Sequence, residues 1–105
     1  MRATKASGYA KLLSAAAHPI RLMILAKLVK GQMCVSNFQE LLDIPQPRVS
    51  QHLALLKKRG LVICHKKGAL RCYHLAQPEF MHDLVAVLER DYPTLKTRDQ
   101  AKCTS

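Results

Sequence analysis

Two short helical patterns on either side of the linker DIPQP constrain the fold of this chain most strongly. The first pattern, SNFQELL, offers Ser36 as a helix N-cap with Gln39 three residues later, which is the spacing of a capping box. The second pattern runs from Pro47 to about Arg59 and stops before Gly60, with proline suited to the first helical position. Two helices joined by a tight turn are typical of a helix-turn-helix.

Two further helices are predicted before this pair. In the first, Tyr9 and Leu12 lie on the apolar stripe, and the pattern stops at the dipeptide HP because proline disfavours helix in the residue before it. The second helix, PIRLMILAKLVKG, begins with Pro19 and ends with Gly31, which suit a helix start and a helix stop. Its apolar residues nearly encircle it, so we expect it to be the most buried helix.

The segment LVICHKKGALRCYHL predicts a β-hairpin with its turn at KKGA, where Gly68 can supply an unusual backbone angle. A lone hairpin is marginally stable, so this one must pack on the helices. A last helix is predicted from Pro78 to just before Pro93, and its apolar residues are Met81, Leu84, Val85 and Leu88. The sequence therefore predicts one mainly helical α+β domain over residues 1–93, with about five helices and a two-stranded hairpin, and a polar, flexible tail over residues 94–105.

Charge and length restrict the function. The 17 lysines and arginines outnumber the 7 aspartates and glutamates, so the formal net charge is +10. In a protein of 105 residues this charge suits a polyanion such as nucleic acid, and the length leaves no room for a separate catalytic domain. No nucleophile–base arrangement and no glycine-rich phosphate loop is present in the sequence, so we expect no enzymatic activity.

The N-terminal segment indicates a cytoplasmic protein. Ser7, Lys11 and Ser14 interrupt the apolar run that a secretory signal would need, and no stretch approaches the length of a membrane span. In the cytoplasm the four cysteines should be reduced thiols.

The predicted helix after Pro47 has two different sides. At about 100 degrees per residue, the apolar side carries Val49, His52, Leu53 and Leu56. The side left for a partner carries Arg48, Gln51, Ala54 and Lys58. Arginine and glutamine can make paired hydrogen bonds to guanine and adenine edges, and Ser50 can reach a base or a phosphate.

Phosphate contacts can come from the basic residues that follow. The candidates are Lys57, Lys58, Arg59 and, at the hairpin tip, Lys66 and Lys67. The alternatives to DNA binding are that the helix is merely a solvated charged helix, that the lysines are ordinary turn residues, and that His52 is half-buried and hydrogen-bonded. The agreement of net charge, helix-turn-helix and a basic hairpin tip favours DNA binding.

The run from AHPIRLMIL through VSQHLALLKKRGLV to CYHL resembles the winged-helix repressors of the ArsR/SmtB family. The resemblance covers most of the chain and is weakest at both ends. It implies a bacterial or archaeal homodimeric transcription repressor that binds double-stranded, palindromic operator DNA and is released by an effector. By this resemblance the DNA-reading segment includes Gln46, Arg48, Ser50, Gln51 and His52.

The resemblance also implies a dimer interface formed by the first and last helices. An apolar stripe on the last helix suits that role independently, because a single small domain would leave it partly exposed. The interface candidates are Tyr9, Leu12, Met81, Leu84 and Leu88.

Family members that sense arsenite or soft metals commonly carry a Cys-Val-Cys element at the start of the third helix. Here the corresponding residues are Cys34, Val35 and Ser36, so one thiol is kept and the second is absent. Cys103 in the tail is the candidate partner, with arsenite, a soft metal ion or cysteine oxidation as the effector. The alternative is that Cys34 is a buried packing residue.

Two other metal sites are weaker hypotheses. A zinc site on the last helix would have His82 as its only histidine, and zinc prefers nitrogen and sulfur, so we expect no metal there. In the hairpin, Cys72 and His74 share one face, and the register decides whether Cys64 or His65 joins them. Packing is the usual role of such residues.

The function expected from the sequence is a DNA-binding repressor that a thiol-reactive or metal effector releases. The alternative is a constitutive repressor, or one that a protein partner controls, because the second cysteine of the sensing element is missing.

Overall fold

The structure is a computed structural model that describes residues 1–92. Within these residues the chain order is α1 (Ala3–Ala16), α2 (Pro19–Val29), β1 (Met33–Cys34), α3 (Val35–Leu42), α4 (Gln46–Lys58), β2 (Val62–Lys67), β3 (Leu70–Leu75) and α5 (Pro78–Leu88). The predicted helices, hairpin and winged-helix arrangement are confirmed. The predicted tail, residues 94–105, lies outside the described residues.

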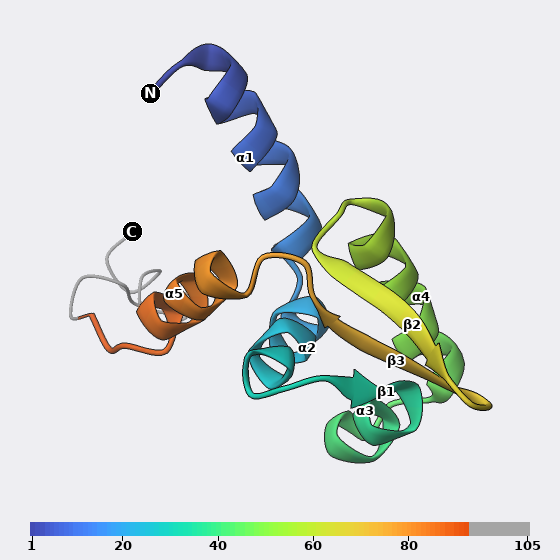
Figure 1. Ribbon diagram of the computed structural model, residues 1–105. Helices are drawn as coiled ribbons and strands as arrows, with labels where there is room; N and C mark the ends of the chain where they lie inside the picture. The colour runs from blue at the N-terminus through green and yellow to red at the C-terminus, as the bar shows by residue number, and fades with distance from the viewer. Residues whose placement is uncertain (93–105) are drawn as a thin grey trace.

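Helix α2 is the centre of the fold. It contacts the four other described helices and strand β3, and within it only Pro19 and Met23 are exposed. Figure 1 shows α5 beside α2, the hairpin of β2 and β3 alongside α4, and α1 extending from the rest of the protein. The sequence prediction that α2 is the most buried helix is therefore confirmed.

The helix-turn-helix consists of α3 and α4, but the predicted capping box of α3 was wrong. Cys34, not Ser36, is the N-cap, and its backbone N–H donates a hydrogen bond to Oδ1 of Asn37 at 3.1 Å. The reason is strand β1, which holds Met33 and Cys34 extended against β3, so that the helix begins directly after them. Gly60 follows α4 with a φ of 81°, as the predicted helix stop requires.

The sheet has three antiparallel strands in the order β1-β3-β2, whereas the sequence predicted only the hairpin of β2 and β3. A two-residue strand is too short for an alternating pattern to reveal it. In the hairpin, Lys67 pairs with Leu70, so Gly68 and Ala69 form a two-residue turn. Gly68 has a φ of 65°, which a type II′ turn requires at its first central position.

The core is mainly aliphatic and draws on every described helix. Its fully buried members include Ile24, Leu25, Phe38, Val49, Leu53 and Leu56. Strands β2 and β3 close the core with Val62, Tyr73 and Leu75. The hairpin thus packs on the helices, as the sequence analysis predicted because an isolated hairpin is only marginally stable.

The described part of the chain contains no single helix that is long and apolar enough to cross a membrane. Helices α1 and α2 together have the length and composition, but they are bent by 99° relative to each other.

We predict that Leu53→Ala destabilises the protein by about 2–5 kcal/mol, because Leu53 is 0% exposed and its loss leaves a cavity. The matched control is Leu41→Ala on α3, where the leucine is 54% exposed and the change should stay within about 0.5 kcal/mol. Urea unfolding followed by circular dichroism at one fixed protein concentration measures both. Equal losses for the two variants would contradict the packing described for α4.

Candidate nucleic-acid interface

Helix α4 is held in one orientation by its apolar side. Val49, Leu53 and Leu56 are fully buried and face the core. The opposite side is open to solvent, and its exposed residues are Arg48, Gln51, Ala54 and Lys58. The two sides predicted from the helical periodicity are confirmed, so these polar side chains are free to contact a partner.

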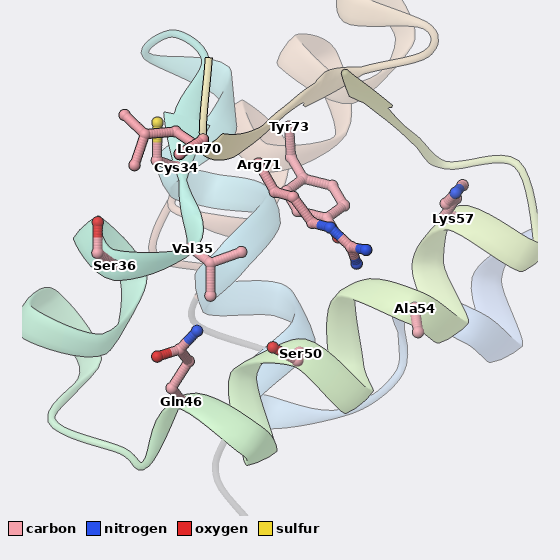
Figure 2. A pocket seen from close by; sticks show the side chains of 11 residues that line it. Cys34, Val35, Ser36, Gln46, Ser50, Ala54, Lys57, Leu70, Arg71 and Tyr73 are labelled. Carbon is pink, nitrogen blue, oxygen red and sulfur yellow. The ribbon is translucent and has the colours of Figure 1, made fainter. Parts of the chain in front are cut away.

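A pocket of about 460 Å³ lies between α4 and the sheet. Figure 2 shows Arg71 and Tyr73 extending from β3 towards α4. The α4 side of the pocket is lined by Gln46, Ser50, Ala54 and Lys57. Among the described residues that line it, none is acidic, and both Lys57 and Arg71 are cationic. The pocket therefore suits an anionic group.

Arg71 was missed by the sequence analysis, which assigned wing contacts to Lys66 and Lys67 alone. The register places Lys66 directly opposite Arg71, so both share the face of the sheet that Tyr73 presents to the pocket. Lys67 lies one residue on and therefore on the other face. The hairpin register, had it been known, would have identified Arg71, because strand residues alternate between faces.

Like charges that stand directly opposite each other on a sheet are destabilising. Lys66 and Arg71 are such a pair, and Lys57 lies on the α4 wall of the pocket that Arg71 lines. Each of the three is exposed. An anion between them would remove this repulsion.

His52 is held differently from the exposed residues of α4. Its Nδ1 accepts a hydrogen bond from Nε of Arg21 at 3.2 Å, and its ring centroid lies 4.6 Å from that of His18. Arg21 also donates through Nη1 to the backbone oxygen of Ala15 at 3.0 Å. His52 thus connects α4 to the start of α2, which corresponds to the half-buried, hydrogen-bonded alternative left open by the sequence.

Burial lowers the pKa of the His52 imidazole, and the positive charges of His18, Arg21 and Arg48 lower it further. A neutral imidazole is also what the hydrogen bond from Arg21 requires, because Nδ1 must keep its lone pair.

The metal-capable residues of the hairpin are divided between two faces. Cys64 is opposite Tyr73, whereas His65 is opposite Cys72, so His65 is the residue that joins Cys72 and His74. The Nδ1 atoms of His65 and His74 lie 3.3 Å apart. Across residues 1–92, no three His, Cys, Asp or Glu side chains form a group that could hold a metal ion.

Of the two candidate sensor cysteines, only Cys34 lies within the described residues. Cys34 is partly buried at the junction of β1 and α3, while Cys103 lies outside the described residues.

The candidate dimer residues lie on two helices that contact each other. The rings of Tyr9 on α1 and Phe80 on α5 are 5.6 Å apart. Met81 is only 3% exposed, so it packs within the protomer and offers almost no surface to a partner. Leu12 and Leu84 are partly buried, and Leu88 is 55% exposed. Leu13 and Val87 are further exposed apolar residues of α1 and α5.

We predict that the free energy of unfolding falls as the pH drops below about 6.5, the pKa that His52 has when the chain is unfolded. The folded protein disfavours the proton that the unfolded chain binds, so the stability is present above this pH and is lost below it. In His52→Gln this loss should be smaller. Urea titrations at about pH 7.5 and about pH 5.5 measure it. His82→Gln, an exposed histidine on α5, is the control and should keep the wild-type loss.

Comparison with known proteins identifies the family. A family model for "Bacterial regulatory protein, arsR family" matches residues 18–63. The chain is 40% identical over 72 residues to the HTH-type transcriptional repressor SmtB of Mycobacterium tuberculosis. These aligned residues cover 69% of this chain and 53% of that protein. The chain thus spans about half the length of this curated relative.

Solved structures agree in fold. HlyU from Vibrio cholerae has a TM-score of 0.78 at 30% identity, covering 85% of this chain and 96% of the other. The transcriptional repressor BigR from Xylella fastidiosa has a TM-score of 0.74 at 32% identity, covering 81% and 86%. These relatives are transcriptional regulators and not enzymes, in agreement with the sequence prediction. With its matching residues 18–63 and its winged-helix fold, this chain belongs to the ArsR/SmtB family of transcriptional regulators.

Proposed function

We propose that the protein is a sequence-specific DNA-binding repressor that binds a palindromic operator as a homodimer. The observation that supports this most is the exposed polar side of α4 beside a cationic pocket shared with the wing. The names of two relatives, the transcriptional repressors SmtB and BigR, favour repression as the outcome of binding.

In this proposal the exposed side of α4 reads base edges in the major groove. Arg48 and Gln51 carry the side chains that pair with guanine and adenine, and both are exposed at the front half of the helix. Gln46 and Ser50 lie on the pocket side and reach the groove edge. His52 supports the helix through Arg21 more than it contacts a base.

Phosphates occupy the cationic positions around the helix. Lys57 and Arg71 line the pocket, and Lys66 stands opposite Arg71 on the same face of the sheet. A phosphate bound there compensates the repulsion between the two opposed wing cations. Lys58 and Lys67 are also exposed and add contacts to the sugar–phosphate backbone. Such contacts supply affinity without sequence information and explain why the chain carries a formal charge of +10.

A two-fold dimer places two copies of α4 on the same side of the DNA, with half-sites about one helical turn apart or a multiple of it. We assign the interface to α1 and α5, where Leu13, Val87 and Leu88 are large apolar residues that the protomer leaves 46%, 47% and 55% exposed. Covering them with a second copy removes this apolar area from water.

Control by an effector belongs to the same proposal, with Cys34 as the responsive residue, because it is the N-cap of the first helix of the helix-turn-helix. The competing function is a constitutive repressor. Operator binding by protein that is reduced, oxidised, or loaded with arsenite or zinc separates the two, since a constitutive repressor binds equally in all of these states.

We predict that Arg48→Ala and Gln51→Ala each lower discrimination between operator and scrambled duplex by about 1–3 kcal/mol, because each removes a base contact. The operator is first selected from a random duplex library with wild-type protein, and affinities are measured by fluorescence anisotropy. Arg71→Ala should instead weaken both duplexes alike and reduce the salt slope by about 1. The charge-matched control is Lys30→Ala at the end of α2, which should leave the slope unchanged. An operator preference that survives Arg48→Ala and Gln51→Ala unaltered would refute the assigned orientation of α4.

We predict that Leu88→Asp converts the protein from dimer to monomer, because a carboxylate would be buried in the apolar interface. Sedimentation velocity at micromolar protein concentration measures the change. Leu41→Asp on α3 is the control, since Leu41 is equally exposed at 54% but lies outside the assigned interface. A dimer that persists in Leu88→Asp, or a wild-type monomer, would contradict this interface.

A further inference from the structure

Two thiols face each other across the sheet. The register pairs Cys34 of β1 with Cys72 of β3, and all three cysteines of residues 1–92 are free. Directly opposed residues of antiparallel strands have Cα atoms about 4.5–5.5 Å apart, and their side chains share one face. Disulfides span Cα distances of about 4.4–6.8 Å, so the backbone already permits a bond between these two residues.

The two thiols differ in their access to solvent. Cys72 is 1% exposed in the central strand, with Cys34 on one side and His65 on the other. Cys34 is partly buried and sits in the short edge strand β1. A small oxidant in solution therefore meets Cys34 first, while Cys72 can be reached chiefly from its neighbours.

We propose that Cys34 and Cys72 form a modification site, a dithiol that a hydroperoxide oxidises reversibly to a disulfide. In the first step Cys34 sulfur attacks the peroxide, the O–O bond breaks, and Cys34 becomes a sulfenic acid while an alcohol, or water from hydrogen peroxide, is released. In the second step Cys72 sulfur attacks Cys34 sulfur, the S–O bond breaks, and water leaves with the Cys72 proton. The two thiols lose two electrons and two protons, and the peroxide gains them. An external dithiol reverses the reaction.

The pKa of Cys72 is consistent with its being the sulfur that reacts in the second step. Its pKa is raised, chiefly by the hydrogen bond with the Cys34 side chain and then by burial. Cys72 therefore keeps its proton while the pair is reduced, so Cys72 is not the sulfur that attacks the peroxide. Cys34, the more accessible sulfur, remains the one that the oxidant reaches.

Other pairings within the described residues are excluded by the register. Cys64 stands opposite Tyr73, on the other face of the sheet from Cys72. A closed metal site is also not formed at this pair, because no three ligand-type side chains of residues 1–92 converge.

The bond would connect the start of the helix-turn-helix to the wing. Cys34 is the N-cap of α3, and β3 carries the pocket residues Arg71 and Tyr73. A disulfide would fix the spacing between these two parts of the interface. The modification itself does not depend on DNA binding, so it stands or fails separately from the proposed function.

Tryptic mapping of the folded, full chain tests the proposal. Cleavage after lysine and arginine places Cys34, Cys64 and Cys72 on separate peptides, residues 31–48, 60–66 and 72–90. Wild-type protein is treated with hydrogen peroxide, its remaining thiols are alkylated, and the digest is analysed by mass spectrometry. We expect a linked pair of peptides 31–48 and 72–90 that dithiothreitol separates.

Matched variants make the outcome decisive. Cys64→Ser and Cys103→Ser should keep the linked pair, whereas Cys72→Ser and Cys72→Ala should lose it and leave a sulfenic acid on Cys34 that dimedone captures. Circular dichroism verifies that each variant is folded, and the wild-type map needs no variant. A link from peptide 31–48 to the peptide of Cys103, a link to peptide 60–66, or irreversible oxidation of Cys34 without any link would overturn the proposal.

Discussion

Burial of one side of α4 is the constraint on which the remaining structure depends. Val49, Leu53 and Leu56 have no exposed surface, so the helix cannot rotate without opening the core. This single fixed orientation decides which polar side chains reach solvent and which wall α4 contributes to the pocket. The hairpin packs against the same helix and core, so the recognition surface is a consequence of core packing.

The cations of the recognition surface repel one another in the free protein, and a bound phosphate would remove this repulsion. Lys66 and Arg71 are directly opposed cations, and Lys57 lines the α4 wall of the pocket that Arg71 also lines. Nothing in the aliphatic core requires this arrangement, and it weakens the hairpin that carries it. Phosphate binding makes the electrostatic contribution of these cations favourable, because each cation then gains a counter-charge and releases condensed ions from the nucleic acid. A surface that is costly alone and favourable with an anion is typical of a nucleic-acid interface.

Two polar clusters link this surface to the rest of the protein. Arg21 connects His52 on α4 to the end of α1 by two hydrogen bonds. Cys34 and Cys72 connect the start of α3 to the central strand of the wing. Both clusters join segments that are distant in sequence, and each contains a group whose charge or bonding can change, the His52 imidazole in one and the two thiols in the other.

The sequence alone determined the helices, the helix-turn-helix, the hairpin and the two sides of α4, because apolar periodicity, prolines and glycines act over a few neighbouring residues. The tertiary structure decided the rest. Strand β1 has only two residues and exists through its pairing with β3, and that pairing moved the N-cap of α3 from Ser36 to Cys34. Register likewise made Arg71 a pocket residue and placed Cys34 opposite Cys72, since a shift of one residue would exchange the two faces of the sheet. Such long-range pairings leave no local pattern in the chain, and so only the folded protein defines them.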